Sequence, residues 1–113
     1  RIHINMCEFF EIYDLLVTPT VMTAPSLVEF RYINEVAGVK FTNYVDWLMH
    51  TFLITPTGCP AVSVPCGFTN DGLPVGLQLV APPRAEAALL SAAAAFEGNQ
   101  SLKWQTPINP RVK

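Results

Sequence analysis

Two runs of strand-forming residues with a tight turn between them, followed by an alanine-rich segment, constrain the fold more than any other feature. The runs cover residues 61–65 and 74–81, and Asp71-Gly72 lies between them. Asn, Asp and Gly tolerate the left-handed backbone that such turns require. Two prolines then precede a helix expected over residues 84–97. The pattern predicts a β-hairpin whose following helix packs back onto the sheet.

The second of these strands has no consistently polar face. Such a strand is typical of a sheet that helices cover on both sides. Gly76 would let another group approach the backbone closely, and Gln78, if buried, must find hydrogen-bond partners. Alternation predicts that Val75, Leu77 and Leu79 share one face, while Gly76, Gln78 and Val80 share the other.

The rest of the chain shows shorter patterns, which apolar spacing, caps and prolines delimit. In the helix over 84–97, we expect Leu89, Leu90, Ala93 and Phe96 to face the sheet. Before the hairpin, we expect a helix over residues 2–13, a strand over 15–17 closed by Thr18-Pro19-Thr20, and an irregular loop over 21–42. A second helix follows, which Asn43 caps and which Pro56 and Gly58 end; its apolar face is formed by Val45, Leu48, Met49 and Phe52. After the last helix, we expect an extended tail that carries Trp104.

The composition suggests that other protein covers much of this chain. At 113 residues there is room for one small domain, and half of the residues are hydrophobic. Only 14% are charged, against about 25% in ordinary soluble domains. The chain also begins in mid-pattern, at Arg1. We therefore expect residues 1–113 to be a single segment of a larger domain, with no internal boundary.

Charge and cysteine content narrow the function classes. Seven basic and nine acidic residues give a net charge of -2 without charge runs, which gives no footprint for nucleic acid or an anionic membrane surface. No apolar run reaches the roughly 18 residues that a membrane span needs. Cys7, Cys59 and Cys66 are odd in number and lack C-x-x-C spacing. Free thiols in a reducing cytoplasm are the simplest interpretation.

The hairpin segment carries a family resemblance. Residues 58–67 follow the pattern G-x-P-A-x-S-x-P-x-G, and residues 72–78 read G-L-P-V-G-L-Q. This run resembles the C-terminal end of the amidase signature family of serine amide hydrolases, and D-L-L-x-T-P-T at 14–20 adds support. The resemblance implies an α/β fold in which this chain forms part of a mixed β-sheet flanked by helices.

The resemblance also places the chemistry upstream of this chain. Family members hydrolyse a carboxylic amide with two serines and a lysine, and the nucleophile lies in a Gly-Gly-Ser-Ser-Gly-like loop. No such loop occurs here, and the four serines, Ser26, Ser63, Ser91 and Ser101, are not in glycine-rich settings. The resemblance thus implies no catalytic residue in this chain, a structural role for Ser63, no cofactor, and two partners: a small amide substrate and the remaining N-terminal part of the enzyme.

The passage from the second helix into the hairpin is the expected pocket wall. By resemblance, the segment just before G-x-P-A lines the substrate site. Thr51 and Ile54 are one helical turn apart, and Thr55 precedes the turn at Pro56. Many relatives carry Asn where this chain has Thr55. We expect Thr51, Ile54 and Thr55 to be the substrate-binding residues.

Two other interpretations compete with this one. Asp46 and His50 are four residues apart on one helical face, so with Cys59 they could form a self-contained thiol hydrolase. The chain could instead be a non-catalytic module that binds a partner or self-associates as a homo-oligomer. The histidines show no metal-ligand spacing such as H-E-x-x-H, so no metal site is expected.

Overall fold

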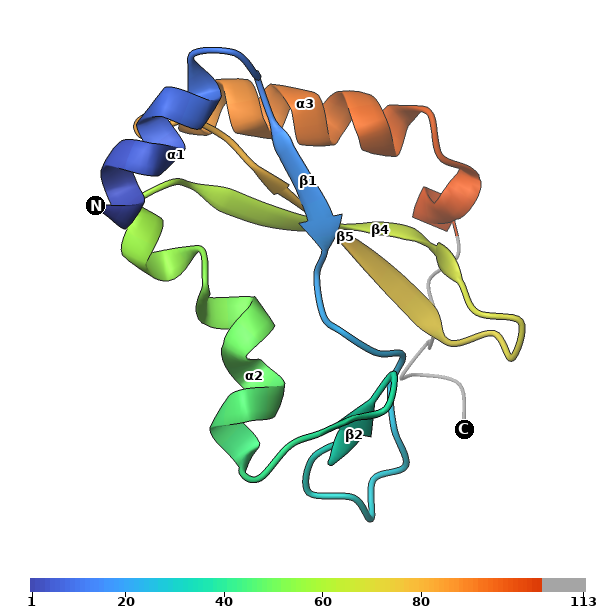
Figure 1. Cartoon of the computed structure of the whole chain (residues 1–113). Coiled ribbons are helices and arrows are strands. Elements are labelled where there is room, and N and C mark those ends of the chain that lie inside the picture. Colours follow the sequence, from blue (N-terminus) through green and yellow to red (C-terminus); the bar gives the residue numbers. More distant parts are fainter. Residues whose placement is uncertain (105–113) are drawn as a thin grey trace.

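The computed structural model describes residues 1–104, and Figure 1 shows how the elements are arranged. No helix among these residues is both long and apolar enough to cross a membrane. The helices are α1 (Ile2–Phe10), α2 (Tyr44–Phe52) and α3 (Glu86–Gly98), with 3-10 turns η1 (Thr55–Thr57) and η2 (Ser101–Trp104); the strands are β1 (Leu16–Pro19), β2 (Glu35–Val36), β3 (Val39–Lys40), β4 (Ala61–Phe68) and β5 (Pro74–Val80).

The predicted hairpin supplies β4 and β5 of a three-stranded antiparallel sheet with strand order β1-β5-β4, in which β5 is the central strand. In the middle of the sheet, Gln78 lies opposite Thr18 on one side and Ser63 on the other. Gly72 in the turn has a φ of 80°, as the sequence required. An irregularity between Pro65 and Gly67 lets β4 continue past the predicted end to Phe68. The α/β class is confirmed.

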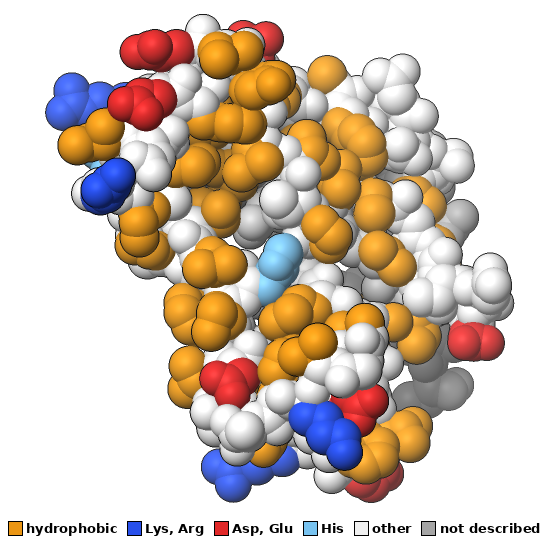
Figure 2. Space-filling view, viewed as in Figure 1, with side chains coloured by type: hydrophobic (Ala, Val, Ile, Leu, Met, Phe, Trp, Pro, Cys, Tyr) orange, Lys and Arg blue, Asp and Glu red, His pale blue; other side chains and the backbone are white. Residues whose placement is uncertain are grey.

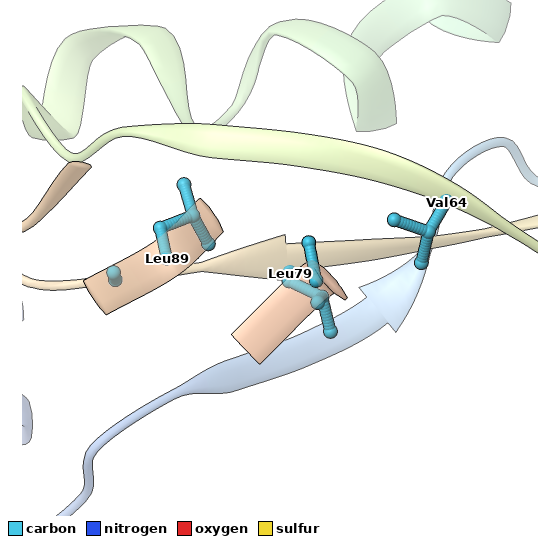
Figure 3. Packing of buried hydrophobic residues seen from close by; sticks show 5 residues of the cluster. Val64, Leu79 and Leu89 are labelled. Carbon is cyan, nitrogen blue, oxygen red and sulfur yellow. The ribbon is translucent and has the colours of Figure 1, made fainter. Parts of the chain in front are cut away.

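The core lies between this sheet and α3. Val64 from β4, Leu79 from β5 and Ala81, which directly follows β5, pack against Leu89 and Ala93 from α3, and Figure 3 shows how Val64, Leu79 and Leu89 lie in this cluster. Phe96 packs against the margin of this cluster. In contrast, Leu90 is 61% exposed, so its predicted position facing the sheet is wrong.

The first helix and the first strand differ from their predicted bounds. α1 ends at Phe10, three residues early, because the chain turns where the Glu11 amide bonds to two carbonyls, those of Cys7 and Glu8. β1 continues through Pro19 instead of being closed by it. Proline is tolerated in a strand whose missing N–H points away from the ladder. Pro19 stands on an edge strand, which satisfies that condition.

The segment predicted as an irregular loop contains a small hairpin. β2 and β3 pair antiparallel, with Val36 opposite Val39. Ala37 and Gly38 connect them with φ values of 50° and 81°. Two consecutive positive φ values define the tight turn that matches strand twist. The sequence analysis missed this turn because alanine rarely adopts that backbone.

The helices away from the hairpin bury nothing completely. Neither α1 nor α2 contains a buried residue, and both lie beside the sheet rather than over it (Figure 1). Apolar side chains accordingly spread across the middle of the face in Figure 2, whereas the charged groups gather toward its ends. The low charge content of the sequence thus corresponds to apolar surface that residues 1–104 leave open.

Candidate functional site

The predicted pocket wall runs from the end of α2 through η1 into β4. Asn43 is the predicted cap at the start of α2, the helix that leads into this stretch, since its Oδ1 accepts hydrogen bonds from the amides of Val45 at 2.8 Å and Asp46 at 3.1 Å. At the other end, Gly58 closes η1 in the left-handed conformation with a φ of 71°. The cap therefore fixes where α2 begins, and the glycine fixes where the passage turns into the sheet.

Thr57 holds the passage together. It is the one buried polar residue of the part that the structure describes, with 3% of its surface exposed. Its hydroxyl donates to the Ile54 carbonyl at 2.5 Å and accepts from the Cys59 amide at 3.2 Å. Its own carbonyl accepts a hydrogen bond from Nδ1 of His3, which connects α1 to η1. Buried polar groups need such partners, so this network defines the shape of the turn.

The three predicted substrate-binding residues surround that network. Ile54 is half-buried, whereas Thr51 and Thr55 are exposed. The Thr51 hydroxyl is directed at its own helix, where it donates to the Leu48 carbonyl at 2.7 Å. Thr55 opens η1, and its carbonyl accepts the Gly58 amide at 3.3 Å. All three therefore lie on one short stretch that runs from the last turn of α2 into η1.

A second polar feature crosses the sheet on the face opposite α3. Gln78 Nε2 donates to Thr18 Oγ1 at 3.2 Å, and Thr20 Oγ1 lies 2.7 Å from Ser63 Oγ. Gly76 lies beneath the second pair: a Cβ added there would come within 2.8 Å of Thr20 Oγ1 and 3.0 Å of Ser63 Oγ. The predicted close approach at Gly76 and the predicted partner for Gln78 are both confirmed.

Sequence reasoning missed the threonine partners in this strip. The pattern predicts only that Thr18 and Thr20 close a strand, yet each contributes a hydroxyl to a pair with a residue of the hairpin. The alternation of Thr18 and Thr20 around Pro19 was the available signal. It could not be used without the register of β1 against β5, which connects residues about sixty positions apart in the sequence.

An open hollow lies along the other side of α2. Its volume is about 420 Å³. Its lining is mostly apolar and includes one histidine, one lysine and one aspartate. None of Thr51, Ile54 and Thr55 borders it. The lining residues are Met22, Val39, Lys40, Phe41, Asp46, Met49, His50 and Leu53.

The structure does not assemble the thiol hydrolase that Asp46, His50 and Cys59 suggested. Asp46 Oδ2 accepts hydrogen bonds from the hydroxyl of Thr42 at 2.9 Å and from its amide at 3.2 Å, and the pKa of the carboxyl is lowered by these bonds first and by Asn43 to a smaller extent. His50 Nε2 instead donates to the Pro19 carbonyl at 2.7 Å. This alternative is therefore not supported, because groups at the start of α2 bond to the Asp46 carboxylate and the Pro19 carbonyl bonds to the His50 imidazole.

Cys59 does not face His50 either. Its Sγ lies 3.9 Å from the Thr57 carbonyl. The thiol that does meet an imidazole is Cys7, whose Sγ lies 3.7 Å from His3 Nε2. Within residues 1–104, no three His, Cys, Asp or Glu side chains come together in a way that could hold a metal ion.

Comparison with known proteins identifies the family. The family model described as Amidase matches residues 1–90. This chain belongs to the amidase family. A glutamyl-tRNA(Gln) amidotransferase subunit of Moorella thermoacetica is 53% identical over 98 residues, which are 87% of this chain and 19% of that protein. The acylamidase of Rhodococcus erythropolis is 39% identical over 112 residues, covering 92% of this chain and 22% of the relative.

Solved amidase structures have the same fold over this segment. A bacterial aryl acylamidase of the amidase signature enzymes superimposes with a TM-score of 0.75 at 29% identity, covering 86% of this chain and 20% of that one. A 6-aminohexanoate cyclic dimer hydrolase complexed with substrate gives a TM-score of 0.66 at 31% identity, covering 85% and 21%. The resemblance to the amidase signature family is confirmed. The chain spans about a fifth of the length of the relatives it matches.

Proposed function

We propose that this segment is the C-terminal scaffold and one substrate-pocket wall of a cytoplasmic enzyme that hydrolyses a carboxylic amide to the acid and ammonia or an amine. The observation that carries the proposal is the family match over residues 1–90. The relatives named above include an acylamidase and a component of an amidotransferase, so their names describe chemistry at the bond between an acyl carbon and nitrogen.

The reaction follows from the chemistry of an activated serine. Its hydroxyl oxygen attacks the amide carbonyl carbon while a base takes the proton, the C–N bond breaks, and the nitrogen leaves carrying a proton. Water then attacks the acyl ester, which releases the acid and restores the serine. We place this serine, its serine partner and the lysine outside residues 1–113, as the resemblance implies.

The environment of the serines in this chain supports that placement. Ser63 shares its hydrogen bond with the Thr20 hydroxyl, and Ser91 donates to the Ala87 carbonyl at 2.8 Å. No lysine or other basic group takes part in either hydrogen bond, whereas an attacking serine needs a base that its hydrogen bonds can reach. We therefore assign Ser63 and Ser91 a structural role.

Within this segment, we assign substrate contact to Thr51, Ile54 and Thr55. The two threonines are exposed on a stretch that Thr57 and His3 hold in place. Rigid support of this kind keeps a binding group within the tolerance that recognition needs. Ile54 adds half-buried apolar surface between them. The wall thus offers the exposed Thr55 hydroxyl, the apolar Ile54 side chain and the exposed Thr51 side chain, whose hydroxyl donates to the Leu48 carbonyl.

The first experiment treats the whole enzyme with a fluorophosphonate probe and maps the labelled peptide by mass spectrometry. We expect label on a serine outside residues 1–113, together with loss of hydrolysis of a panel of simple amides. Label on Ser63, or hydrolysis that survives complete labelling, would contradict the proposal.

A second experiment tests the pocket wall. Thr55→Ala in the whole enzyme should change KM for the best amide several-fold with a smaller effect on kcat, since a binding contact is lost. Thr69→Ala is the matched control, because Thr69 directly follows β4 and lies in the turn to β5, at the opposite end of that strand. Equal kinetics for the two variants would remove Thr55 from the wall.

A second candidate function has support from the surface. Apolar side chains such as Val28, which is 93% exposed, and Ile12, which is 78% exposed, would suit a non-catalytic module that binds a partner or a second copy. Intact mass under denaturing conditions separates the candidates. A lone folded 12.5 kDa species without hydrolysis favours the module, whereas a much longer active chain or companion favours the amidase.

A further inference from the structure

The thiols of this chain have different neighbours, although Cys7, Cys59 and Cys66 are all partly exposed. The Cys59 thiol is directed at the Thr57 carbonyl, with 3.9 Å between the sulfur and the oxygen. A carbonyl oxygen accepts a hydrogen bond but is too weak a base to take the proton. The Cys7 sulfur instead lies 3.7 Å from Nε2 of His3. Among residues 1–104, Cys7 is therefore the thiol that has an imidazole nitrogen within reach.

The hydrogen bond on the other side of the imidazole decides which nitrogen carries the proton. His3 Nδ1 bonds to the Thr57 carbonyl, and because a carbonyl only accepts, Nδ1 must donate. In a neutral imidazole one nitrogen donates and the other accepts. Nε2 therefore presents a lone pair to the Cys7 thiol and can take its proton. A nucleophile, a base and a third group that orients the base together form the arrangement that activates a side chain for attack.

The pair is held in place and is open to solvent. His3 and Cys7 lie one turn apart on the same face of α1, which brings their side chains together. The His3 ring packs over Gly58, where an added Cβ would lie 3.3 Å from Nδ1. His3 is exposed and Cys7 is half-buried. A reagent can therefore reach the sulfur while η1 fixes the position of the base.

The charges around Cys7 select the kind of reagent. The exposed acids Glu8 and Glu11 follow it on α1 and at the end of that helix, and the last turn of α1 contains no basic residue. A negative local potential repels anions and concentrates cations. A small disulfide that is neutral or positively charged suits this surface better than an anionic one.

We propose that Cys7 is a modification site at which a small neutral or cationic disulfide forms a mixed disulfide, and that the adduct releases His3 from the pocket wall. His3 Nε2 takes the thiol proton, and the Cys7 thiolate attacks one sulfur of the disulfide. A new S–S bond forms as the old one breaks, and the leaving sulfur departs with the electron pair and the proton from His3. The Cys7 sulfur is oxidised and the leaving sulfur is reduced to a thiol.

The adduct changes the surroundings of the imidazole. The modified sulfur has no hydrogen left to donate to Nε2, and the added group occupies space beside the ring. His3 is the side chain of α1 that bonds to Thr57, and Thr55 and Thr57 belong to the same short turn, η1. This part rests on the proposed function, in which Thr55 contacts the substrate. We expect the adduct to raise KM for the amide several-fold, with a smaller effect on kcat.

The first test measures the reaction of each thiol with cystamine, a cationic disulfide, in the whole enzyme. Mass spectrometry gives the rate of adduct formation at Cys7, Cys59 and Cys66. Cys7 should react at least about tenfold faster than the other two in the folded enzyme, because only its thiol has a base beside it. The three rates should become similar in denaturant. Equal rates in the folded enzyme, or a Cys7 that is slower than either control thiol, would overturn the proposal.

His3→Asn separates the base from the structural contact. Asparagine can still donate from its side-chain amide to the Thr57 carbonyl, but it has no basic nitrogen to face Cys7. Reaction of Cys7 with cystamine should slow by about tenfold, to a rate near that of Cys59. An unchanged rate would overturn the role of His3. The comparison of the three thiols in the unaltered enzyme decides the site even if this variant fails to fold.

Amide hydrolysis on the same samples tests the effect on the pocket wall. Cystamine should raise KM of the unaltered enzyme, and dithiothreitol should restore it. Cys7→Ser should have the KM of the untreated enzyme with or without cystamine, whereas Cys59→Ser, the matched control, should remain sensitive. Full modification of Cys7 without a change in KM would overturn the release of His3. An enzyme that hydrolyses no amide before treatment would contradict the proposed function alone, since the labelling rates still decide the modification site.

Discussion

The hairpin and its helix, residues 61–98, bury side chains, whereas the region from α1 through α2 does not. All six buried apolar residues lie in the first of these regions: Val64, Leu79, Val80, Ala81, Leu89 and Ala93. α2 has an equally clear apolar stripe, yet Met49 is 45% exposed and Phe52 is 43% exposed. Both regions adopt regular secondary structure. They differ in whether a neighbour from the same segment covers the apolar face.

The difference shows that helix formation and burial have separate causes. α2 begins at Tyr44 because the Asn43 side chain accepts two of the amides that every helix leaves open at its start. Its apolar face then requires a surface to pack against, and nothing nearby in the sequence supplies one. α3 finds that surface at once, since the preceding hairpin presents Leu79 and Val64 to it. Most helical stability in proteins comes from such packing.

The largest loss of stability should come from truncating a side chain in the buried region. Leu89→Ala removes a side chain that is 3% exposed, and truncations of this kind cost about 2–5 kcal/mol. The adjacent Leu90 is 61% exposed, so Leu90→Ala should change stability by roughly 0.5 kcal/mol or less. Denaturant unfolding of both variants measures the contrast. Equal losses would mean that α3 is covered on both sides and would end the distinction between the regions.

A smaller loss of stability is expected at Gly76, where two hydroxyl groups lie close to the backbone. Gly76→Ala places a methyl group 2.8 Å from Thr20 Oγ1 and 3.0 Å from Ser63 Oγ, and overpacking of this size costs about 1–3 kcal/mol. Thr20→Ala should relieve part of the clash, so the double variant should be more stable than the sum of the single effects. Thermal unfolding of the four proteins measures this coupling, and simple additivity would rule out the close contact.

The hairpin and its helix were predictable because their determinants are local. The turn needed Asp71-Gly72, the strands needed alternation over a few residues, and α3 needed an apolar stripe. Errors occurred where a distant partner decided the outcome. Pro19 could stay in β1 only because its missing N–H faces the outer edge, which depends on the pairing with Leu77.

In the candidate site too, the sequence predicted what depends on neighbouring residues and missed what depends on distant ones. Family resemblance pointed to Thr51, Ile54 and Thr55, and the structure places them on one stretch. It could not reveal that Thr57, the last residue of η1, is the buried residue that organises this stretch, because its network depends on His3 near the start of the chain. Asp46 and His50 had suitable spacing for catalysis. Spacing on one helix does not show which other elements bond to those side chains.

The next effect tests the claim that α2 forms from local determinants. Asn43→Ala removes the side-chain oxygen that accepts two amides of the first turn, and loss of such a cap costs about 1 kcal/mol. Asn43→Ser is the matched control, since serine can accept the same bonds and should cost much less. Hydrogen exchange at Val45 and Asp46 reports the change directly. If both variants behave alike, surrounding packing rather than the cap maintains α2.

The smallest effect concerns the acid next to that cap. Hydrogen bonds from Thr42 and then Asn43 lower the pKa of Asp46 below its ordinary value. A carboxyl whose pKa is lower in the folded state stabilises that state above the unfolded-state pKa of about 3.9, and this contribution is lost as pH falls through the folded value. NMR titration of Asp46 should therefore give a midpoint below that of an unfolded peptide. Thr42→Val deletes the hydroxyl donor and should raise the midpoint, while a midpoint that does not move would show that the Thr42 hydroxyl has no part in the shift.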